Sequence, residues 1–393
     1  MLSTLAIAGY RSLRQLLVPL GQLTVVTGPN GSGKSSVYRA LRLLADTAQG
    51  SVIQSLAREG GMDSVLWAGP EQLSAAMRRG EAPVQGTVRH KPVHLRLGFA
   101  GPDAADFGYA IDIGFPVPIP PSVFDRDPEV KAEAVWSGPV LRPATLLVRR
   151  QGALLETRAA NAGWERVDRM LPAYASMLAE FLDPRTAPEM LTLREQIRNW
   201  RFYDHFRSDA GAPARTAQIA TRTPVLGHDG ADLASAIATI EEVGDAEGLA
   251  AAVDDAFPGA RLEVRAQDGL FETLMHQPGL LRPLRAAELS DGTLRYLLWI
   301  AALLTPRPPP LLVLNEPETS LHPDLLPALG RLVARAARGS QVVVVSHSPR
   351  LIAAVEEDPT LQLRYVVLEK RLGETRIANL DDGEMPVWHW PAR

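Results

Sequence analysis

Apolar and polar residues alternate differently along successive parts of the chain. Residues 22–28 form a β-branched apolar run that ends at glycine, and a helical spacing of apolar residues follows from residue 34. Residues 93–99 and 107–115 alternate apolar with polar positions, and residues 145–158 have the pattern of a hairpin. The first part of the chain therefore predicts a strand and a helix, followed by antiparallel strands with one face exposed to water.

The middle of the chain has a helical pattern. Four segments carry an apolar face at helical spacing: residues 171–182, 189–206, 231–243 and 247–257. A hairpin pattern over 261–276, with its turn at Asp268 and Gly269, closes this region.

Five segments then alternate between helix and strand patterns: residues 292–304, 310–315, 324–337, 340–346 and 349–357. This alternation is typical of parallel strands in an α/β sheet. The last apolar runs, 363–370 and 375–380, predict a hairpin at the edge of a sheet.

Composition narrows the class of protein. The chain of 393 residues has no cysteine, which excludes disulfides, cysteine nucleophiles and thiolate metal sites. Its net charge of −4 excludes a global basic field for nucleic acid and leaves only a local patch as a candidate. The longest apolar segment, 296–304, is far shorter than the roughly 20 residues of a membrane span. We therefore expect a cytoplasmic protein without membrane insertion.

Residues 28–36, GPNGSGKSS, match the phosphate-binding pattern G-x-x-x-x-G-K-[ST]. Backbone N–H groups of such a loop surround phosphates, the lysine reaches the β and γ phosphates, and the following serine hydroxyl binds Mg²⁺. A chance glycine-rich turn is the alternative, but this loop follows a predicted strand and precedes a predicted helix. The expected nucleotide-binding residues are Gly28, Pro29, Asn30, Gly31, Ser32, Gly33, Lys34, Ser35 and Ser36.

Three later segments carry further candidates. Ser290, Asp291 and Gly292 precede a predicted helix, Asn315 and Glu316 end one buried strand, and His347 follows another. Ligands of parallel α/β sheets bind at the carboxyl ends of strands, so the loop at Gly28, Glu316 and His347 can converge. Taken singly, a helix cap is the favoured interpretation of the first segment and an ordinary loop histidine that of the last, and Glu316 could be a solvated strand end. Taken together, in this order and after a P-loop, the segments favour a shared site instead.

The order of these motifs resembles the ABC-type ATPase heads of the SMC, RecF and OLD-like group. The segments that carry the resemblance are the P-loop, LSDGT, LNEPETSLHP and SHS, together with LAIAGYRSL before the P-loop and TPVLGHDGADLASAI in the middle. They are most similar to predicted bacterial ATPases labelled AAA-type domain 21. The resemblance implies a P-loop NTPase fold of the α/β class, with a parallel core sheet, an antiparallel β subdomain and a helical insertion. We expect an N-terminal lobe over 1–160, a mostly helical insertion over 161–284 and a C-terminal lobe over 285–393, together one ATPase head.

The resemblance also implies a mechanism. Two copies would pack head to tail around two ATP molecules, so that Ser290, Asp291, Gly292 and Ser320 of one copy approach nucleotide held by the other. Glu316 would orient or deprotonate the attacking water, and His347 would contact the γ-phosphate. Arg11 is expected near the nucleotide as well. For the glutamine loop of the family, Gln151 is the nearest candidate by order, although the tip of a hairpin is an equally good interpretation.

Asn315 departs from the pattern of the family, which has aspartate at this position to help hold Mg²⁺. An amide keeps a carbonyl acceptor and loses the charge. That loss, about 5 Å from a divalent ion, costs a few kcal/mol at an effective dielectric constant of about 20. Since Glu316 is intact, and a general base contributes typically about 10²- to 10⁴-fold, we expect a slow ATPase whose metal ligands include Ser35 and Asn315.

Two middle segments leave alternatives open. Arginines and aromatic residues interleave over 194–207, which suits either a surface for single-stranded nucleic acid or an amphipathic element with an aromatic core face. The core interpretation is favoured, because arginine supplies nearly all of the basic charge of this chain. Asp229 and Asp232 read as a capping turn more readily than as a pair of metal ligands.

Three functions remain in competition. The leading one is an ATP-dependent homodimeric switch in DNA maintenance or phage defence, with ATP and Mg²⁺ as cofactors and a separate effector or nuclease as partner. Nucleic acid stays a candidate ligand. A nucleotide-gated scaffold without turnover and the ATPase subunit of a transporter are the alternatives.

Overall fold

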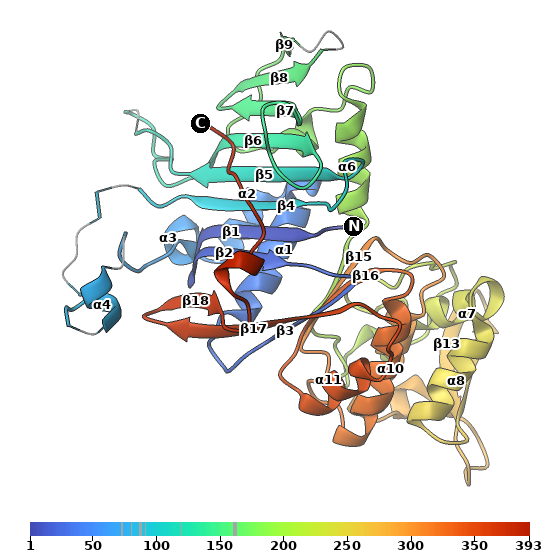
Figure 1. The fold of residues 1–393 in the computed structure, drawn as a ribbon. Coiled ribbons are helices and arrows are strands. Elements are labelled where there is room, and N and C mark those ends of the chain that lie inside the picture. The colour runs from blue at the N-terminus through green and yellow to red at the C-terminus, as the bar shows by residue number, and fades with distance from the viewer. Residues whose placement is uncertain (72–73, 80, 86–88, 91, 119, 160–162) are drawn as a thin grey trace. The chain divides into compact units, whose positions relative to one another are not determined.

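A computed structural model describes residues 1–71, 74–79, 81–85, 89–90, 92–118, 120–159 and 163–393 (Figure 1). The chain divides into two compact units. Unit 1 comprises Met1–Gly21, Val26–Asn199 and Tyr365–Arg393, and unit 2 comprises Gln22–Val25 and Trp200–Arg364. Strand β3 (Leu23–Thr27) therefore begins in unit 2 and ends in unit 1, and β17 (Leu363–Arg371) does the same.

The described part of unit 1 contains an antiparallel sheet of eight strands in the order β2-β1-β4-β5-β6-β7-β8-β9. Its strands are β1 (Thr4–Tyr10), β2 (Leu13–Pro19), β4 (Leu95–Ala100), β5 (Phe107–Gly114), β6 (Glu129–Ser137), β7 (Leu146–Gln151), β8 (Leu154–Arg158) and β9 (Trp164–Arg166). The hairpin predicted over 145–158 is confirmed, because β7 pairs antiparallel with β8. Strands β2 and β6 were not predicted from the sequence.

The expectation that one face of the antiparallel sheet is exposed to water is wrong for the centre of this sheet. Every residue of β5 after Phe107 is buried, because both faces of the strand are covered. Trp388 of the C-terminal segment lies against β4 and β6, with its ring 5.4 Å from that of Trp136. Arg393 donates to the Asp112 carboxylate of β5. Figure 1 shows this segment, in red, crossing the strands.

Helices α1 (Lys34–Gln49), α5 (Met177–Glu180) and α6 (Pro188–Arg198) pack together in unit 1, and α1 contacts the sheet. Glu133 of β6 forms a buried ion pair with Arg150 of β7 and accepts from it at 2.9 Å. The same carboxylate accepts from the backbone N–H of Met177 at 2.8 Å and so joins the sheet to α5. Helix α2 (Val52–Arg58) also packs against α1, and two further short helices, α3 (Met62–Val65) and α4 (Ala75–Arg79), follow it in the chain.

The hairpin predicted at the end of the chain is confirmed. Strand β17 pairs antiparallel with β18 (Glu374–Ile377), and β18 contacts β2 within unit 1. A short 3-10 turn, η4 (Asp382–Glu384), precedes the C-terminal segment.

Unit 2 contains the parallel strands β10 (Arg201–Tyr203), β15 (Leu311–Asn315) and β16 (Gln341–Val345). The start of β3 continues this sheet beside β16, because the N–H of Val342 donates to the carbonyl of Gln22 at 2.9 Å. The helices of the unit are α7 (Leu233–Val243), α8 (Ala246–Ala256), α9 (Asp291–Leu303), α10 (Leu326–Ala336) and α11 (Pro349–Glu356), with 3-10 turns η1 (Pro213–Arg215), η2 (Ala286–Glu288) and η3 (Pro323–Leu325). The predicted helix–strand alternation beyond residue 285 is confirmed.

A second, antiparallel sheet in unit 2 contains β11 (Gln218–Ile219), β12 (Arg261–Gln267), β13 (Leu270–His276) and β14 (Leu284–Arg285). The predicted turn between β12 and β13 is confirmed, because Asp268 and Gly269 both have positive φ, 51° and 75°. The interval 161–284 thus contains strands as well as helices. The boundaries at 160 and 284 stay a prediction.

Two helix predictions in the middle region are wrong in extent. Over 171–182 only Met177–Glu180 is helical, and over 189–206 the helix ends at Arg198 and strand β10 follows. The reason is tertiary, since β10 pairs with β15 and this pairing satisfies backbone groups that a helix would otherwise pair internally.

The core interpretation of the aromatic residues in this segment is confirmed. Trp200, Phe202, Tyr203 and Phe206 are all buried. The ring of Phe206 lies 4.9 Å from that of Trp299 in α9, so β10 and the segment after it are anchored on the central helix of unit 2.

Candidate nucleotide-binding site

The P-loop connects β3 with α1 in unit 1. Pro29, Asn30, Gly31 and Ser35 are exposed, whereas Ser32 and Lys34 are buried. The carbonyl of Gly33, the N-cap of α1, accepts from the N–H groups of Ser36 at 3.0 Å and Val37 at 3.1 Å. The strand–loop–helix context required for a phosphate-binding loop is therefore present.

Glycine is required at both ends of the loop for steric reasons. A Cβ on Gly28 would lie 2.2 Å from the carbonyl oxygen of Leu368, and one on Gly33 would lie 2.4 Å from the Thr375 hydroxyl. Both glycines have positive φ, 144° and 107°. The Thr375 hydroxyl donates to the carbonyl of Ser32 at 2.7 Å, so β18 fixes the underside of the loop.

The side chain of Lys34 binds back to the loop that contains it. Its Nζ donates to the carbonyls of Gly28 at 2.7 Å and Pro29 at 3.1 Å. An ammonium group has three N–H donors, so among the described residues one donor is left for a phosphate. The Ser32 hydroxyl is also buried without a partner there. This charge and these donors suit a polyphosphate.

Arg11, expected near the nucleotide, has another partner in this structure. Its guanidinium lies 2.6 Å from the Glu59 carboxylate, which also accepts from the Tyr10 hydroxyl at 2.7 Å. Burial, together with Glu59, raises the pKa of Tyr10 above its ordinary value. The approach of Arg11 to a nucleotide stays a prediction. Gln151 ends β7 with an exposed side chain, as the hairpin interpretation expects.

In unit 2, Asn315 ends β15 and Glu316 follows it in the left-handed region, at φ 47°. The N–H of Glu316 donates to the carbonyl of Val345 at 2.8 Å, which continues the β15–β16 ladder by one residue. A left-handed backbone costs a non-glycine residue roughly 1–3 kcal/mol and marks a position where the surrounding structure dictates the direction of the side chain. Ser320 is left-handed as well, at φ 61°.

His347 lies near two carboxylates. Its Nδ1 is 4.0 Å from Glu316 and 3.3 Å from Glu318. Glu318 is buried and accepts from the Ser346 hydroxyl at 2.7 Å and the His347 N–H at 3.0 Å. Glu318 was not predicted from the sequence, although a second glutamate two residues after Glu316 was a visible signal. Glu318 orients the histidine loop beside Glu316.

Ser290, Asp291 and Gly292 form the start of α9. The Ser290 hydroxyl accepts from the N–H of Thr293 at 3.1 Å, so Ser290 is the N-cap of the helix. The backbone oxygen of Ser320 lies 3.7 Å from a Cβ built on Gly292. Unit 2 thus brings the two segments expected to act on a partner's nucleotide close together.

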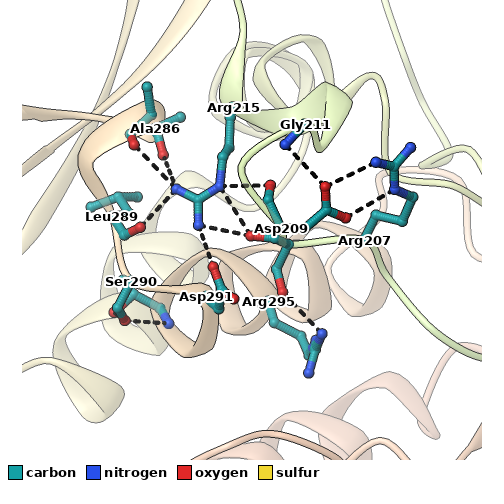
Figure 2. A network of polar contacts seen from close by, with 12 residues as sticks. Arg207, Asp209, Gly211, Arg215, Ala286, Leu289, Ser290, Asp291 and Arg295 are labelled. Carbon is teal, nitrogen blue, oxygen red and sulfur yellow. Dashed lines mark hydrogen bonds and ion pairs between the residues drawn. The ribbon is translucent and has the colours of Figure 1, made fainter.

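Arg215 holds the loop before α9, as Figure 2 shows. Its guanidinium donates to the carbonyls of Ala286 at 3.1 Å and Leu289 at 2.7 Å, and to the Asp291 carboxylate at 2.6 Å. It also donates to the carbonyl of Ser208 at 2.7 Å. Arg215 was not predicted from the sequence, because no local pattern marks an arginine whose partner lies 76 residues away in the chain.

Arg295 in α9 extends this network. It donates to the Ser208 hydroxyl at 2.9 Å and to the carbonyl of Thr319 at 3.1 Å. Burial lowers the pKa of Arg295, and the Asp291 carboxylate partly opposes that effect. The neighbouring pair of Arg207 and Asp209 is exposed, and the Arg207 hydrogen bonds lower the pKa of Asp209 to about 2. The segment 206–215 therefore connects the loop before α9 with the loop after Glu316.

Oxygen donors suited to Mg²⁺ occur at both expected metal positions. The Ser35 hydroxyl belongs to an exposed residue of the P-loop. The Oδ1 atom of Asn315 is buried without a partner among the described residues, while its Nδ2 donates to Asp204 at 2.6 Å. Mg²⁺ prefers oxygen ligands, so the chemistry of each residue, taken by itself, fits the ion.

The described residues contain no cluster of three or more His, Cys, Asp or Glu that would hold a metal by itself. The carboxylate of Asp229 accepts from the N–H of Ala231, and that of Asp232 accepts from the N–H of Gly227. Both form turns before α7, and Asp232 stands at the N-cap position of the helix, although its side chain makes no capping hydrogen bond to α7.

Comparisons with known proteins place the chain in a family. The family model described as "AAA domain, putative AbiEii toxin, Type IV TA system" matches residues 23–99 and 172–353, well over half of the chain. The chain is similar to the SMC head bound to the C-winged helix domain of ScpA, with TM-score 0.49, 13% identity and coverage of 98% of this chain and 99% of that chain. It is also similar to the SMC head domain from Thermotoga maritima, with TM-score 0.48, 15% identity and coverage of 97% and 99%.

A third similar structure is the Smc head domain with an extended coiled coil bound to the C-terminal domain of ScpA, derived from Pyrococcus furiosus. Its TM-score is 0.48 at 13% identity, with coverage of 96% of this chain and 95% of that chain. No curated protein matches the sequence.

Within the described residues, no helix is both long and apolar enough to cross a membrane.

Proposed function

The chain belongs to the family described as "AAA domain, putative AbiEii toxin, Type IV TA system", and from this premise we propose that it is an ATP-hydrolysing switch that dimerises on ATP. AAA domains bind and hydrolyse ATP, so the coarse activity follows from the family. We further propose roles for individual residues, a slow turnover, an ATP-dependent dimer and a task in the cell.

The observation that carries the proposal is the P-loop with its buried lysine. Lys34 Nζ binds two loop carbonyls, so a side chain of the protein itself helps to hold the loop in shape. Pre-organisation lowers the cost of ordering the loop when a triphosphate binds. In the proposal the backbone N–H groups at the start of α1 and the lysine charge hold the β and γ phosphates.

Unit 2 supplies the chemistry in this proposal. Glu316 accepts a proton from the attacking water, and its position is set by the left-handed turn that follows β15. His347 contacts the γ-phosphate, and Glu318 orients it at 3.3 Å. When Mg²⁺ is bound, it neutralises developing phosphate charge, and Ser35 and Asn315 are the residues that would hold it.

The dimer closes the site in trans. Ser290, Asp291 and Gly292 of one copy meet the γ-phosphate bound by the second copy, together with Ser320. The N-terminus of α9 is the positive end of the helix dipole and presents backbone N–H groups, and both favour the binding of an anion. Arg215 and Arg295 join these segments to each other, so a displacement of Ser290 also displaces the loop after Glu316.

Asn315 makes turnover slow in the proposal, because an amide holds the metal less tightly than a carboxylate. A slow switch suits a role in which ATP closes a dimer and hydrolysis reopens it. The family description names a toxin of a toxin–antitoxin system, which favours control or defence, exerted through a separate effector, over transport. A nucleotide-gated scaffold without turnover is the second candidate, and Asn315 is the observation that favours it.

The test compares phosphate release and oligomeric state in Glu316→Gln and wild type, at saturating Mg²⁺ and ATP. We expect the variant to release phosphate about 10²-fold more slowly or worse and to accumulate as a dimer in light scattering. The control is Glu247→Gln, an exposed glutamate on α8 that should behave as wild type. If wild type and Glu316→Gln dimerise on ATP and are equally inert, the protein is the scaffold and not an ATPase.

A further inference from the structure

We propose that Asp204 supplies the carboxylate that the metal site lacks at Asn315, so that the two side chains together act as the acidic residue of the site. This inference rests on the proposed function and names a metal-positioning residue that the motif pattern does not contain.

The geometry places the two residues side by side. Strand β10 pairs in parallel with β15, with Tyr203 opposite Leu314. Asp204 directly follows the last residue of β10, and Asn315 is the last residue of β15, so both lie at the same carboxyl edge of the sheet. The Asn315 amide donates to Asp204 Oδ1 at 2.6 Å, a short hydrogen bond to a carboxylate.

The hydrogen bond between Asn315 and Asp204 leaves one oxygen of each side chain able to accept from, or bind to, another group. Because Nδ2 of Asn315 is directed at Asp204, the amide orientation is set, and Oδ1 is left buried without a partner among the described residues. A buried acceptor without a partner costs free energy unless a donor or cation is supplied. Asp204 is exposed, and its hydrogen bond with Asn315 is made through Oδ1 and not through Oδ2. A cation or its bound water would satisfy both oxygens.

The charge balance supports this assignment over a purely structural hydrogen bond. An aspartate at 315 would bring one negative charge to the site, and the pair of Asn315 with Asp204 brings one as well. A carboxylate and an amide that share a hydrogen bond thus keep the charge of the usual site while moving it to the neighbouring strand. A structural amide–carboxylate bond alone does not require Asn315 Oδ1 to be buried and unpaired.

Exchange of the two residues gives a test with little change in shape. Mn²⁺ binding is measured by electron paramagnetic resonance in the presence of a non-hydrolysable ATP analogue, for wild type, Asp204→Asn and the double variant Asp204→Asn with Asn315→Asp. We expect Asp204→Asn to weaken Mn²⁺ binding about 10- to 100-fold, and the double variant to recover most of the loss. Asp268→Asn, at an exposed hairpin turn where asparagine tolerates the φ of 51°, is the matched control.

Two failures are separable. If wild type does not bind the analogue in a metal-free fluorescence titration, the proposed function fails and this inference with it. If wild type binds analogue and Mn²⁺, but Asp204→Asn has the same Mn²⁺ affinity and only a lower melting temperature, the contact is structural and the inference alone is overturned. Folding of each variant is checked by circular dichroism, and the double variant keeps the test valid should Asp204→Asn be unstable.

Discussion

The guanidinium of Arg215 lies 2.6 Å from the carboxylate of Asp291, the first residue of α9. The arginine side chain is 8% exposed, whereas that of Asp291 is 64% exposed. The ion pair itself is therefore screened by water and contributes little. The hydrogen bonds from Arg215 to backbone carbonyls are the larger contribution, because a buried carbonyl without a donor costs about 1–3 kcal/mol.

This relationship makes Arg215 a positioning residue for Ser290. In Arg215→Ala we expect the free energy of unfolding to fall by roughly 3 kcal/mol, measured by urea denaturation, because several carbonyls lose their donor. In Arg215→Lys the charge remains but the fork of donors is lost. That variant should bind a fluorescent ATP analogue as wild type does and form much less ATP-dependent dimer.

The matched control is Arg207→Lys, which changes an exposed arginine of the same network that pairs with Asp209 (Figure 2). It should dimerise normally. Equal dimer formation by Arg215→Lys and Arg207→Lys would show that Arg215 has no part in placing the N-terminus of α9.

Lys34→Met tests the lysine of the P-loop in two ways. The analogue should bind at least about 10-fold more weakly, because a charge-assisted hydrogen bond to phosphate contributes roughly 1.5–3 kcal/mol. The protein without nucleotide should also melt at a lower temperature, since the carbonyls of Gly28 and Pro29 lose their donor. Lys370→Met, at an exposed position of β17, is the control for both measurements. Unchanged affinity would mean that nucleotide binds elsewhere.

The free energy of unfolding should depend on pH through Asp46 of α1. Burial raises the pKa of Asp46 above its ordinary value of 3.8, and a hydrogen bond from Ser55 partly opposes the rise. A raised pKa in the folded state means that the folded protein binds this proton more tightly, so the stability it contributes is lost as pH rises through that pKa. Asp46→Asn mimics the protonated form at every pH.

We therefore expect the free energy of unfolding of Asp46→Asn, relative to wild type, to be more favourable at pH 7.5 than at pH 4. Urea denaturation at the two pH values measures this difference. A relative stability that does not change between them would contradict a partly buried, destabilised carboxylate in α1.

Much of the local structure was predictable because its causes are local. The glycines and the lysine of the P-loop, the positive-φ turn at Asp268 and the helix–strand alternation after residue 285 follow from side-chain size, backbone freedom and periodicity. The interpretation of 189–206 as one helix failed because the aromatic residues that end it satisfy helical and strand patterns alike. Pairing with β15, more than 100 residues later in the chain, decides between them.

By itself the sequence determined which residues could hold phosphate, orient water and cap α9, because those roles need particular atoms at particular spacings. It also determined that the usual acidic residue is absent at position 315. Only the tertiary structure decided that Asp204 stands beside Asn315, that Glu318 orients His347 and that Arg215 holds the loop before α9. These relationships join residues of different strands and loops, and hydrogen bonds between distant segments leave no periodic trace in a single chain.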